Sequence, residues 1–283
     1  AQDSANDTFF VTDSIAIGER WEVLGSYQSG RYRQSGAQVV EPADERYDLK
    51  SFGVRYAMSP RLALYLSRGE ALELGGTAPL AAANAERVLP SYISRQWEAG
   101  ARVLVSPRLS LELAAFEARK SYEYEDATGE FRQDGTQLHR GAELKAIGVG
   151  YGVQIYASLL LLDAKIRDAF DPAVNGKQAV NVPERSGRLI LESPIPGAPR
   201  WSANVSLNAS GSRPVNATNT ATIPGYAIWG AGMRYERPDW LKGTTLRVDV
   251  DNLFDRGHWI EAPFGTLFLG EPRGIFARVV MRL

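Results

Sequence analysis

Cysteine is absent from the 283-residue chain, which excludes disulfides and thiolate metal sites. Histidine is scarce, and His139 and His258 stand alone in the sequence, so a zinc or haem site built from them is not expected. Neither sign of charge is in excess, because 32 lysines and arginines balance 33 aspartates and glutamates. Without a basic surplus, nucleic acid is not an expected partner.

Long hydrophobic runs are also lacking. The longest apolar stretch, Ala157–Leu162, contains a serine and is far shorter than the roughly 18 residues of a membrane helix. The first ten residues have neither the charged nor the apolar region of a signal peptide, so we expect a mature form or a fragment. Helical periodicity is weak everywhere, and the most helical window, Ala78–Val88, lies beside two glycines and contains a proline.

Alternation of apolar and polar residues is the dominant pattern. From Leu246 to Asp251, and again from Ala277 to Leu283, every second residue is apolar and most of the others are charged. A period of two predicts β-strands, because successive side chains leave a strand on opposite sides. The same reasoning predicts thirteen strands: Phe9–Ile17, Arg20–Tyr32, Tyr47–Met58, Leu62–Gly69, Tyr92–Val105, Leu109–Glu123, Gln137–Val149, Val153–Ile166, Pro183–Ser193, Trp201–Ala209, Ala227–Tyr235, Thr244–Phe254 and Gly274–Leu283.

The connections between these strands alternate between short and long. The long ones are Arg33–Arg46, Glu70–Ser91, Tyr124–Thr136, Arg167–Val182, Ser210–Tyr226 and Asp255–Arg273. Short turns at one end and long loops at the other are typical of an outer-membrane barrel, whereas a Greek-key sandwich mixes lengths at both ends. We therefore predict an all-β, antiparallel, up-and-down transmembrane β-barrel, with the short turns on the periplasmic side and the long loops outside.

The two faces of the predicted strands differ in character. One face carries apolar residues that suit lipid: Phe52, Val54 and Tyr56; Trp97, Ala99, Ala101, Val103 and Val105; Leu109, Leu111, Leu113 and Ala115; and Val153, Ile155, Ala157, Leu159 and Leu161. The opposite face carries residues such as Gln96, Glu98, Arg102 and Glu112, which suit a water-filled lumen.

Specific motifs accompany the alternation. Asp251-Asn252-Leu253-Phe254-Asp255 follows one alternating strand, and Gly270-Glu271-Pro272-Arg273 precedes the last. These residues resemble the C-terminal end of TonB-dependent siderophore receptors. Further segments resemble the same family in order: Leu62–Gly69, Leu89–Pro90, Ser94–Ala101, Ala114–Phe116, His139–Leu144, Leu162–Lys165 and Pro224–Tyr226. The chain departs from the family pattern at its end, where Leu283 stands in place of the usual aromatic residue.

The resemblance implies a fold, a place and a function. The single domain 1–283 is expected to form the C-terminal twelve or thirteen strands of a 22-stranded barrel in the bacterial outer membrane, with the plug domain and the N-terminal strands absent from the chain. Receptors of this family import ferric siderophores with energy from the TonB complex, which here requires the missing N-terminal region. Outer-membrane lipid and the barrel-assembly machinery are the other implied partners. The siderophore holds the iron, so neither a cofactor nor a protein metal ligand is expected.

One alternative remains open at the level of the sequence. A complete barrel of twelve strands, with residues 1–17 outside it, would be a small porin-like channel for passive diffusion. An enzyme is not expected, because no Gly-x-Ser-x-Gly motif is present and neither histidine has a nucleophile at a recognisable spacing.

Ligand binding is expected at the bases of the long loops, where aromatic faces and arginine side chains suit a bulky anionic or neutral iron complex. The candidates are Tyr92, Tyr122, Tyr124, Phe131, Arg140, His258, Trp259 and Phe268. Packing within the loops, or anchoring at the membrane interface, would equally explain each of these residues.

Overall fold

The computed structural model describes residues 2–36, 43–236, 243–261 and 267–281. Within these ranges the chain forms one sheet of thirteen strands and two short two-stranded hairpins. No helix in the described ranges is long and apolar enough to span a membrane.

The strands are close to those that the alternation predicts. The long strands are β1 Gln2–Ile17, β2 Trp21–Gly36, β3 Ala43–Ser59, β4 Leu62–Glu73, β5 Tyr92–Ser106, β6 Leu109–Glu125, β7 Phe131–Gly150, β8 Val153–Arg167, β9 Arg185–Ile195, β10 Ala198–Ser210, β13 Tyr226–Glu236, β14 Thr244–Asp251 and β17 Gly274–Met281. The short strands are β11 Arg213–Pro214, β12 Thr222–Ile223, β15 Trp259–Glu261 and β16 Leu267–Leu269.

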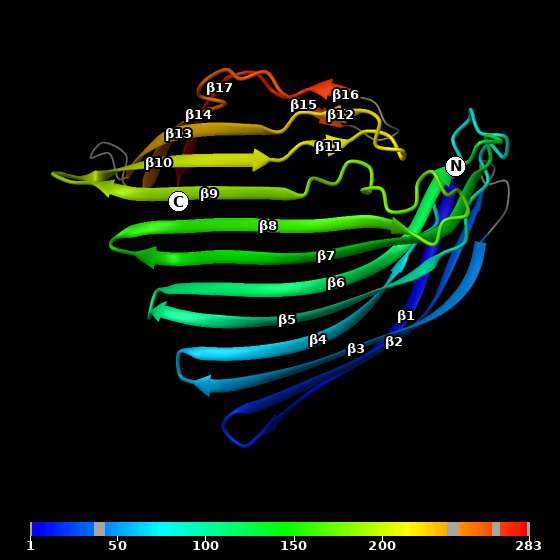
Figure 1. The fold of residues 1–283 in the computed structure, drawn as a ribbon. Helices are drawn as coiled ribbons and strands as arrows, with labels where there is room; N and C mark the ends of the chain where they lie inside the picture. The colour runs from blue at the N-terminus through cyan, green and yellow to red at the C-terminus, as the bar shows by residue number, and fades with distance from the viewer. Residues whose placement is uncertain (1, 37–42, 237–242, 262–266, 282–283) are drawn as a thin grey trace. The chain divides into compact units, whose positions relative to one another are not determined.

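The long strands follow one another in the sheet in chain order, from β1 to β10 and then β13, β14 and β17 (Figure 1). Successive strands from β1 to β4 pair antiparallel. Successive strands in the order β8, β9, β10, β13, β14 and β17 also pair antiparallel. This order confirms the predicted up-and-down arrangement. Tight turns make it possible: Tyr151 and Gly152, between β7 and β8, both have positive φ, as a two-residue hairpin turn between twisted strands requires.

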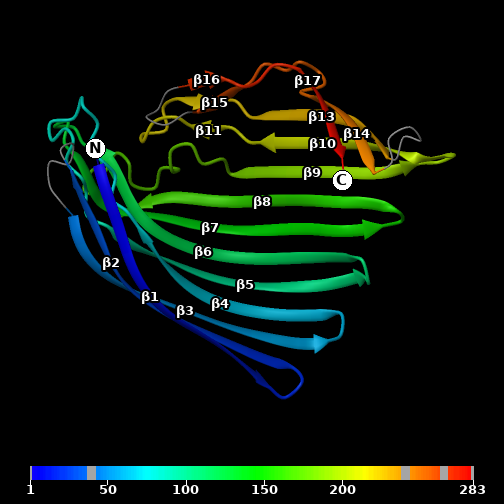
Figure 2. The ribbon, with the colours of Figure 1, turned by 180° about the vertical axis from the view of Figure 1, so that it is seen from behind.

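The chain divides into two compact units. Unit 1 comprises Ala1–Ala101, Ala114–Gly141 and Asp163–Ala179, and it contains β1 to β4 and the loop side of β5 to β8. Unit 2 comprises Arg102–Leu113, Ala142–Leu162 and Val180–Leu283, and in it β9, β10 and β13 lie side by side (Figure 2).

Side-chain contacts support the predicted faces. On the polar face, Arg102 forms an ion pair with Glu112 at 3.4 Å, and the Tyr65 hydroxyl donates to Glu98 at 2.6 Å. On the apolar face, the rings of Phe52 and Trp97 meet edge to face at 6.5 Å. The strands β3 to β6 therefore carry apolar side chains on one face and polar side chains on the other, as the sequence predicts.

The structure differs from the sequence prediction at strand ends and within the long connections. β1 begins at Gln2 and not at Phe9, β2 continues to Gly36, and β4 continues to Glu73. Most of the predicted loop Tyr124–Thr136 is strand, because β6 continues to Glu125 and β7 begins at Phe131. The predicted strand Thr244–Phe254 ends at Asp251, since Asn252 adopts a positive φ of 50°. Pro183 lies outside β9, and the hairpins β11–β12 and β15–β16 occupy connections predicted to be irregular. The end of the last strand at Leu283 and the middle of the loop Arg33–Arg46 lie outside the described residues.

Candidate functional site

Two groups of loops hold six of the eight residues that the sequence predicts for ligand binding. The first, here called the loop cluster, belongs to unit 1 and consists of residues 74–91, 122–135 and 163–179. The second, here called the C-terminal platform, belongs to unit 2 and consists of Tyr226, residues 252–261 and residues 267–273. Each is described on its own.

Tyr122 and Tyr124 form the centre of the loop cluster. Their rings stack with centroids 4.9 Å apart and an interplanar angle of 12°. They are only 3% and 7% exposed. They are the fourteenth and sixteenth residues of β6 counted from its short turn, whereas a membrane strand needs only about 9–11 residues. Both tyrosines therefore lie beyond the membrane-spanning segment, where the loops bury them.

The loop after β8 is fixed to these tyrosines by hydrogen bonds. The backbone N–H of Phe170 donates to Asp134 Oδ2 at 2.6 Å, and the N–H of Asp171 donates to the Tyr124 hydroxyl at 3.4 Å. Gly135, with φ of 81°, lets the backbone approach Ala169 so closely that an added Cβ would lie 2.9 Å from it. Only glycine fits this position at low cost, so β7 and the loop are held together.

The loop after β4 is held in the same way by side chains that are distant in sequence. The Glu123 carboxylate accepts the N–H of Gly76 at 3.0 and 3.2 Å. The Asn84 side chain accepts the N–H of Phe131 at 2.9 Å and donates to its carbonyl at 2.7 Å, as a neighbouring strand would. Hydrogen bonds therefore hold this loop against β6 and β7 as part of the loop cluster.

Burial raises the pKa of Tyr122 to about 12, with a smaller contribution from Tyr124. Burial also raises the pKa of Tyr124. The Tyr122 hydroxyl has no hydrogen-bond partner among the described residues. Burial therefore disfavours the phenolate form of both side chains. Buried beneath the loops and stacked on each other, these two tyrosines support the loop cluster.

The exposed apolar residues of the loop cluster are different ones. Phe170 is 81% exposed and Leu80 is 82% exposed. The sequence prediction missed both. The signal that could have found Phe170 is its position between Asp168 and Asp171, where an aromatic residue in a polar loop has no local packing partner.

Asn252 organises the C-terminal platform. Its side chain donates to the carbonyls of Arg256 at 3.0 Å and Glu271 at 3.1 Å, and it accepts the N–H of Arg256 at 2.8 Å. The Asp255 carboxylate accepts the N–H of Arg273 at 2.9 Å. The Asn-Leu-Phe-Asp motif and the Gly-Glu-Pro-Arg motif are therefore the two ends of one stapled loop, which explains in physical terms why they occur together.

The three predicted residues of this platform lie on or beside one hairpin. The His258 ring packs on Tyr226 with centroids 4.7 Å apart. Trp259 pairs across the hairpin with Leu269, and Phe268 pairs with Ile260, so the two aromatic rings lie on opposite faces. Trp259 is 41% exposed and Phe268 is 55% exposed. Tyr226, which the sequence prediction did not include, belongs to this group.

Phe131, the first residue of β7, belongs to the loop cluster, whereas Tyr92 and Arg140 lie outside it in unit 1. Tyr92 is the first residue of β5 and is half-buried. Arg140 is on the apolar face of β7, where its Nε donates to Glu117 Oε2 at 2.8 Å. The structure thus brings together Tyr122, Tyr124 and Phe131 in one cluster and His258, Trp259 and Phe268 in the other.

The polar wall of unit 2 carries a chain of ion pairs. Glu192 pairs with Arg234 at 2.6 Å and with Arg247 at 3.6 Å, and Arg247 Nε donates to Asp249 at 2.7 Å. Asn204 donates to the other oxygen of Asp249 at 3.2 Å. These carboxylates are therefore held in mutual pairs along the wall. No group of three or more histidine, aspartate and glutamate side chains in the described ranges could hold a metal ion, and the absence of a cofactor stays a prediction.

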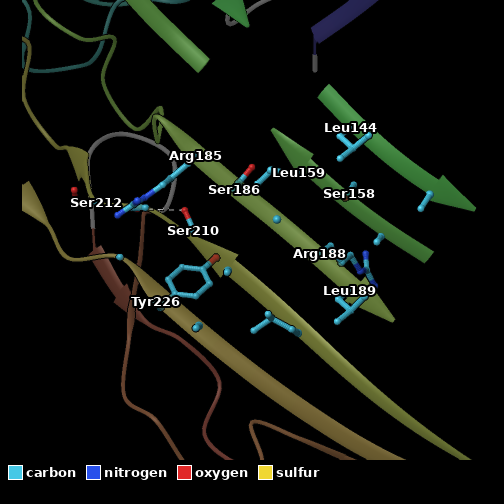
Figure 3. Close-up of a pocket in the computed structure, with 18 of the residues that line it drawn as sticks. Leu144, Ser158, Leu159, Arg185, Ser186, Arg188, Leu189, Ser210, Ser212 and Tyr226 are labelled. Atoms are coloured by element: carbon cyan, nitrogen blue, oxygen red, sulfur yellow. Dashed lines mark hydrogen bonds between the residues drawn. The ribbon is translucent and has the colours of Figure 1, made fainter. Parts of the chain in front are cut away.

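A pocket of about 790 Å³ lies along unit 2, but it is mainly apolar. Figure 3 shows Leu144, Leu159 and Leu189 along the strands and Arg185 and Tyr226 at the other end. Its leucines share the apolar face with Ala157, which pairs directly with Leu189. A groove on this face suits an acyl chain better than a polar iron complex.

The comparisons with known proteins agree with this architecture. The family model "TonB dependent receptor-like, beta-barrel" matches residues 1–253. The ferrichrome receptor FcuA of Yersinia enterocolitica is 28% identical over 295 residues, which cover 98% of this chain and 38% of that protein. Among solved structures, the ferric preacinetobactin receptor BauA of Acinetobacter baumannii has a TM-score of 0.83 at 22% identity, covering 98% of this chain and 43% of that one.

The siderophore receptor PiuA of Acinetobacter baumannii has a TM-score of 0.80 at 17% identity, with 98% and 42% coverage. The chain therefore spans less than half the length of each of these relatives. Because the solved structures are only 17–22% identical to this chain, their similarity establishes the fold. The match to the family model establishes family membership. The chain belongs to the family of TonB-dependent receptor β-barrels.

Proposed function

We propose that this chain is part of a receptor that imports a ferric siderophore across the outer membrane with energy supplied by the TonB complex. The match of residues 1–253 to the TonB-dependent receptor barrel carries the proposal. The chain itself lies in the bacterial outer membrane, as the barrels of this family do. The relatives named above are receptors for two different ligands, ferrichrome and ferric preacinetobactin. We therefore propose the class of ferric siderophores as the ligand, without assigning an individual siderophore.

The two loop groups support the ligand class. Each offers exposed aromatic or apolar side chains on a backbone that buried groups hold in place: Phe170 above the stacked tyrosines, and Trp259 and Phe268 on the hairpin stapled by Asn252. Rigid presentation lowers the entropy cost of binding. Aromatic faces suit the conjugated and amide groups of a bulky iron complex. We propose that the siderophore supplies every iron ligand, and that the chain has no catalytic role.

Uptake of radioactive iron by a strain whose own copy of the gene is deleted tests the proposal. The intact gene should restore uptake of at least one ferric siderophore, and a protonophore or deletion of TonB should abolish it. Uptake that persists without TonB would instead identify passive diffusion. Absence of uptake for hydroxamate, catecholate and carboxylate siderophores alike would refute the ligand class.

A pair of variants locates the ligand surface. Replacing both Trp259 and Phe268 by alanine should weaken binding of the ferric siderophore about tenfold, because the two rings lie on opposite faces of the hairpin and the double variant removes the exposed ring from whichever face the ligand contacts. Tyr151→Ala is the matched control, because this fully exposed aromatic residue lies in the short turn at the opposite end of the strands. Equal loss in both variants would exclude the C-terminal platform as the ligand surface.

A further inference from the structure

The loop cluster carries an excess of carboxylates that the balanced composition of the chain hides. The whole chain has a formal net charge of −1 at pH 7. Residues 74–91, 122–135 and 163–179, which make up the loop cluster, contain nine acidic and five basic side chains, so the formal net charge of the cluster alone is −4. A ligand that reaches these loops therefore meets a negative electrostatic potential.

Carboxylates of the cluster already pair with two of its basic side chains. Arg132 forms ion pairs with Asp126 and with Glu130, each at 2.9 Å. Lys165 forms an ion pair with Asp163 at 3.3 Å. An anionic ligand would have to displace a carboxylate in order to bind either cation, and the displaced carboxylate would then repel the ligand.

The exposed ring of Phe170 has carboxylates on both sides of it in the chain. Asp168 is exposed and Asp171 is half-buried. A third carboxylate, that of Asp134, accepts the backbone N–H of Phe170 at 2.6 Å. The face of an aromatic ring is itself negative and attracts cations. The ring and its neighbouring carboxylates therefore favour the same kind of ligand group, which is cationic and not anionic.

Hydrogen bonds hold the segment that carries Phe170. The Asn175 side chain accepts the N–H of Ala169 at 3.0 Å and donates to the carbonyl of the same residue at 2.7 Å. The Asp171 carboxylate accepts the N–H of Ala173 at 2.8 Å. These bonds fix the backbone on both sides of Phe170, yet the ring remains 81% exposed. An apolar ring held in an exposed position is a feature of binding surfaces, because its order is established before the ligand arrives.

We propose that the loop cluster selects ferric siderophores by charge, binding cationic and neutral iron complexes in preference to anionic ones. Phe170 contacts the ligand, and Asp168 and Asp171 attract a cationic group beside the ring. The inference rests on the proposed function, since it concerns which members of the ligand class this chain takes. Ferric complexes of hydroxamates that carry a free amine belong to the preferred group, and ferric tricatecholates with three negative charges are disfavoured.

Coulomb's law sets the size of the effect. For a ligand about 10 Å from a net charge of −4, each unit of ligand charge changes the affinity by about fourfold at about 50 mM salt. At about 0.5 M salt the same step changes the affinity by less than about 1.5-fold, because the screening length falls to about 4 Å. Salt dependence therefore separates selection by charge from selection by shape.

The test varies the charge of the ligand and keeps its iron centre. Desferrioxamine B, its N-acetyl derivative and its N-succinyl derivative hold ferric iron through the same hydroxamates, and their complexes are a monocation, a neutral species and a monoanion. Binding of each complex to the full-length receptor that contains this chain is measured at low and at high salt.

Two double variants locate the effect. D168N/D171N removes two negative charges beside Phe170, and asparagine tolerates the positive φ of 56° at position 168 and can still accept the N–H of Ala173. E19Q/E236Q is the matched control, because it removes two negative charges at the opposite end of the strands, from the turn before β2 and from the end of β13.

At low salt the wild-type receptor should bind the monocation about tenfold more tightly than the monoanion, with the neutral complex between them, and high salt should nearly abolish the difference. D168N/D171N should reduce the ratio to about fourfold, and E19Q/E236Q should leave it unchanged. Equal binding of the three complexes, or a ratio that the two double variants lower equally, would overturn the inference. Binding of a ferric tricatecholate but of none of the three hydroxamate complexes would overturn it and leave the proposed function standing. Binding of no ferric siderophore at all would refute the proposed function and this inference together.

Discussion

Replacing Ala157 by arginine tests the assignment of the two faces. Ala157 is the fifth residue of β8, so it lies about 10 Å above the short turn and near the middle of an apolar band about 25 Å high. Its partner in the sheet is Leu189, and the groove that it lines contains no carboxylate among the described residues. An arginine at this depth costs about 2–4 kcal/mol, which lowers the folding equilibrium constant by about 30- to 700-fold.

Ser158→Arg is the matched control for this substitution. Ser158 is the next residue of the same strand and is similarly half-buried, but its side chain leaves the strand on the opposite side, where Glu143, Lys145, Arg188 and Asn208 line a polar niche. Water and Glu143 can solvate the new charge there, so we expect a loss of less than about 1 kcal/mol. Urea titration of the intact protein in vesicles, followed by heat-modifiable migration, measures both variants. Equal loss in the two variants would show that the face assignment is wrong.

Three further predictions concern the loops and the polar wall. Asn84→Ala removes two hydrogen bonds to the backbone of Phe131, so it should destabilise the loop cluster by about 1–3 kcal/mol and speed proteolysis within residues 76–89; unchanged proteolysis would contradict the role of Asn84. Because the pKa of Tyr122 is raised from 10.0 to about 12, the unfolded chain loses that proton first, and stability should fall as the pH rises through this window. Tyr122→Phe should flatten this fall in an alkaline unfolding series, and an identical fall would refute the assignment. Glu192→Ala leaves Arg234 and Arg247 without their shared carboxylate and should cost about 1–3 kcal/mol by urea titration, whereas Glu236→Ala, at an exposed partner of Arg234, should cost less.

The strands could be predicted from the sequence because their pattern is local. β5 and β8 each end within one residue of the predicted strands Tyr92–Val105 and Val153–Ile166. A period of two is visible in any short window, and a barrel strand with one face to lipid and one to water must show it. The prediction was wrong where the loop side of a strand leaves the membrane, as in the predicted loop Tyr124–Thr136, since neither face there is required to be apolar.

The site was predicted less well because its determinants are distant in sequence. Aromatic type and loop position identified Tyr122 and Tyr124, but their burial depends on residues 163–179 folding onto them. The bond from Gly76 to Glu123 spans 47 positions, and no local pattern indicates it. Asn252 belongs to a motif that resembles the family's, but only the structure shows that its side chain joins the carbonyls of Arg256 and Glu271.

Strand β6 shows why alternation predicts the side of the strand that a side chain occupies but not the environment that the side chain contacts. Leu113 and Ala115 occupy the apolar face within the band, and Glu117 and Arg119 continue that same face at the height where the hydrocarbon ends. Tyr122 and Tyr124 continue the opposite face beyond it, where loops replace the lumen. One unbroken period of two therefore passes through lipid, headgroup and loop, and the chemistry changes with height although the period does not. Counting residues from the short turn separates these environments. It also accounts for Arg140, which shares its face with lipid-facing residues and yet, as the eleventh residue from the short turn, lies at the edge of the apolar band.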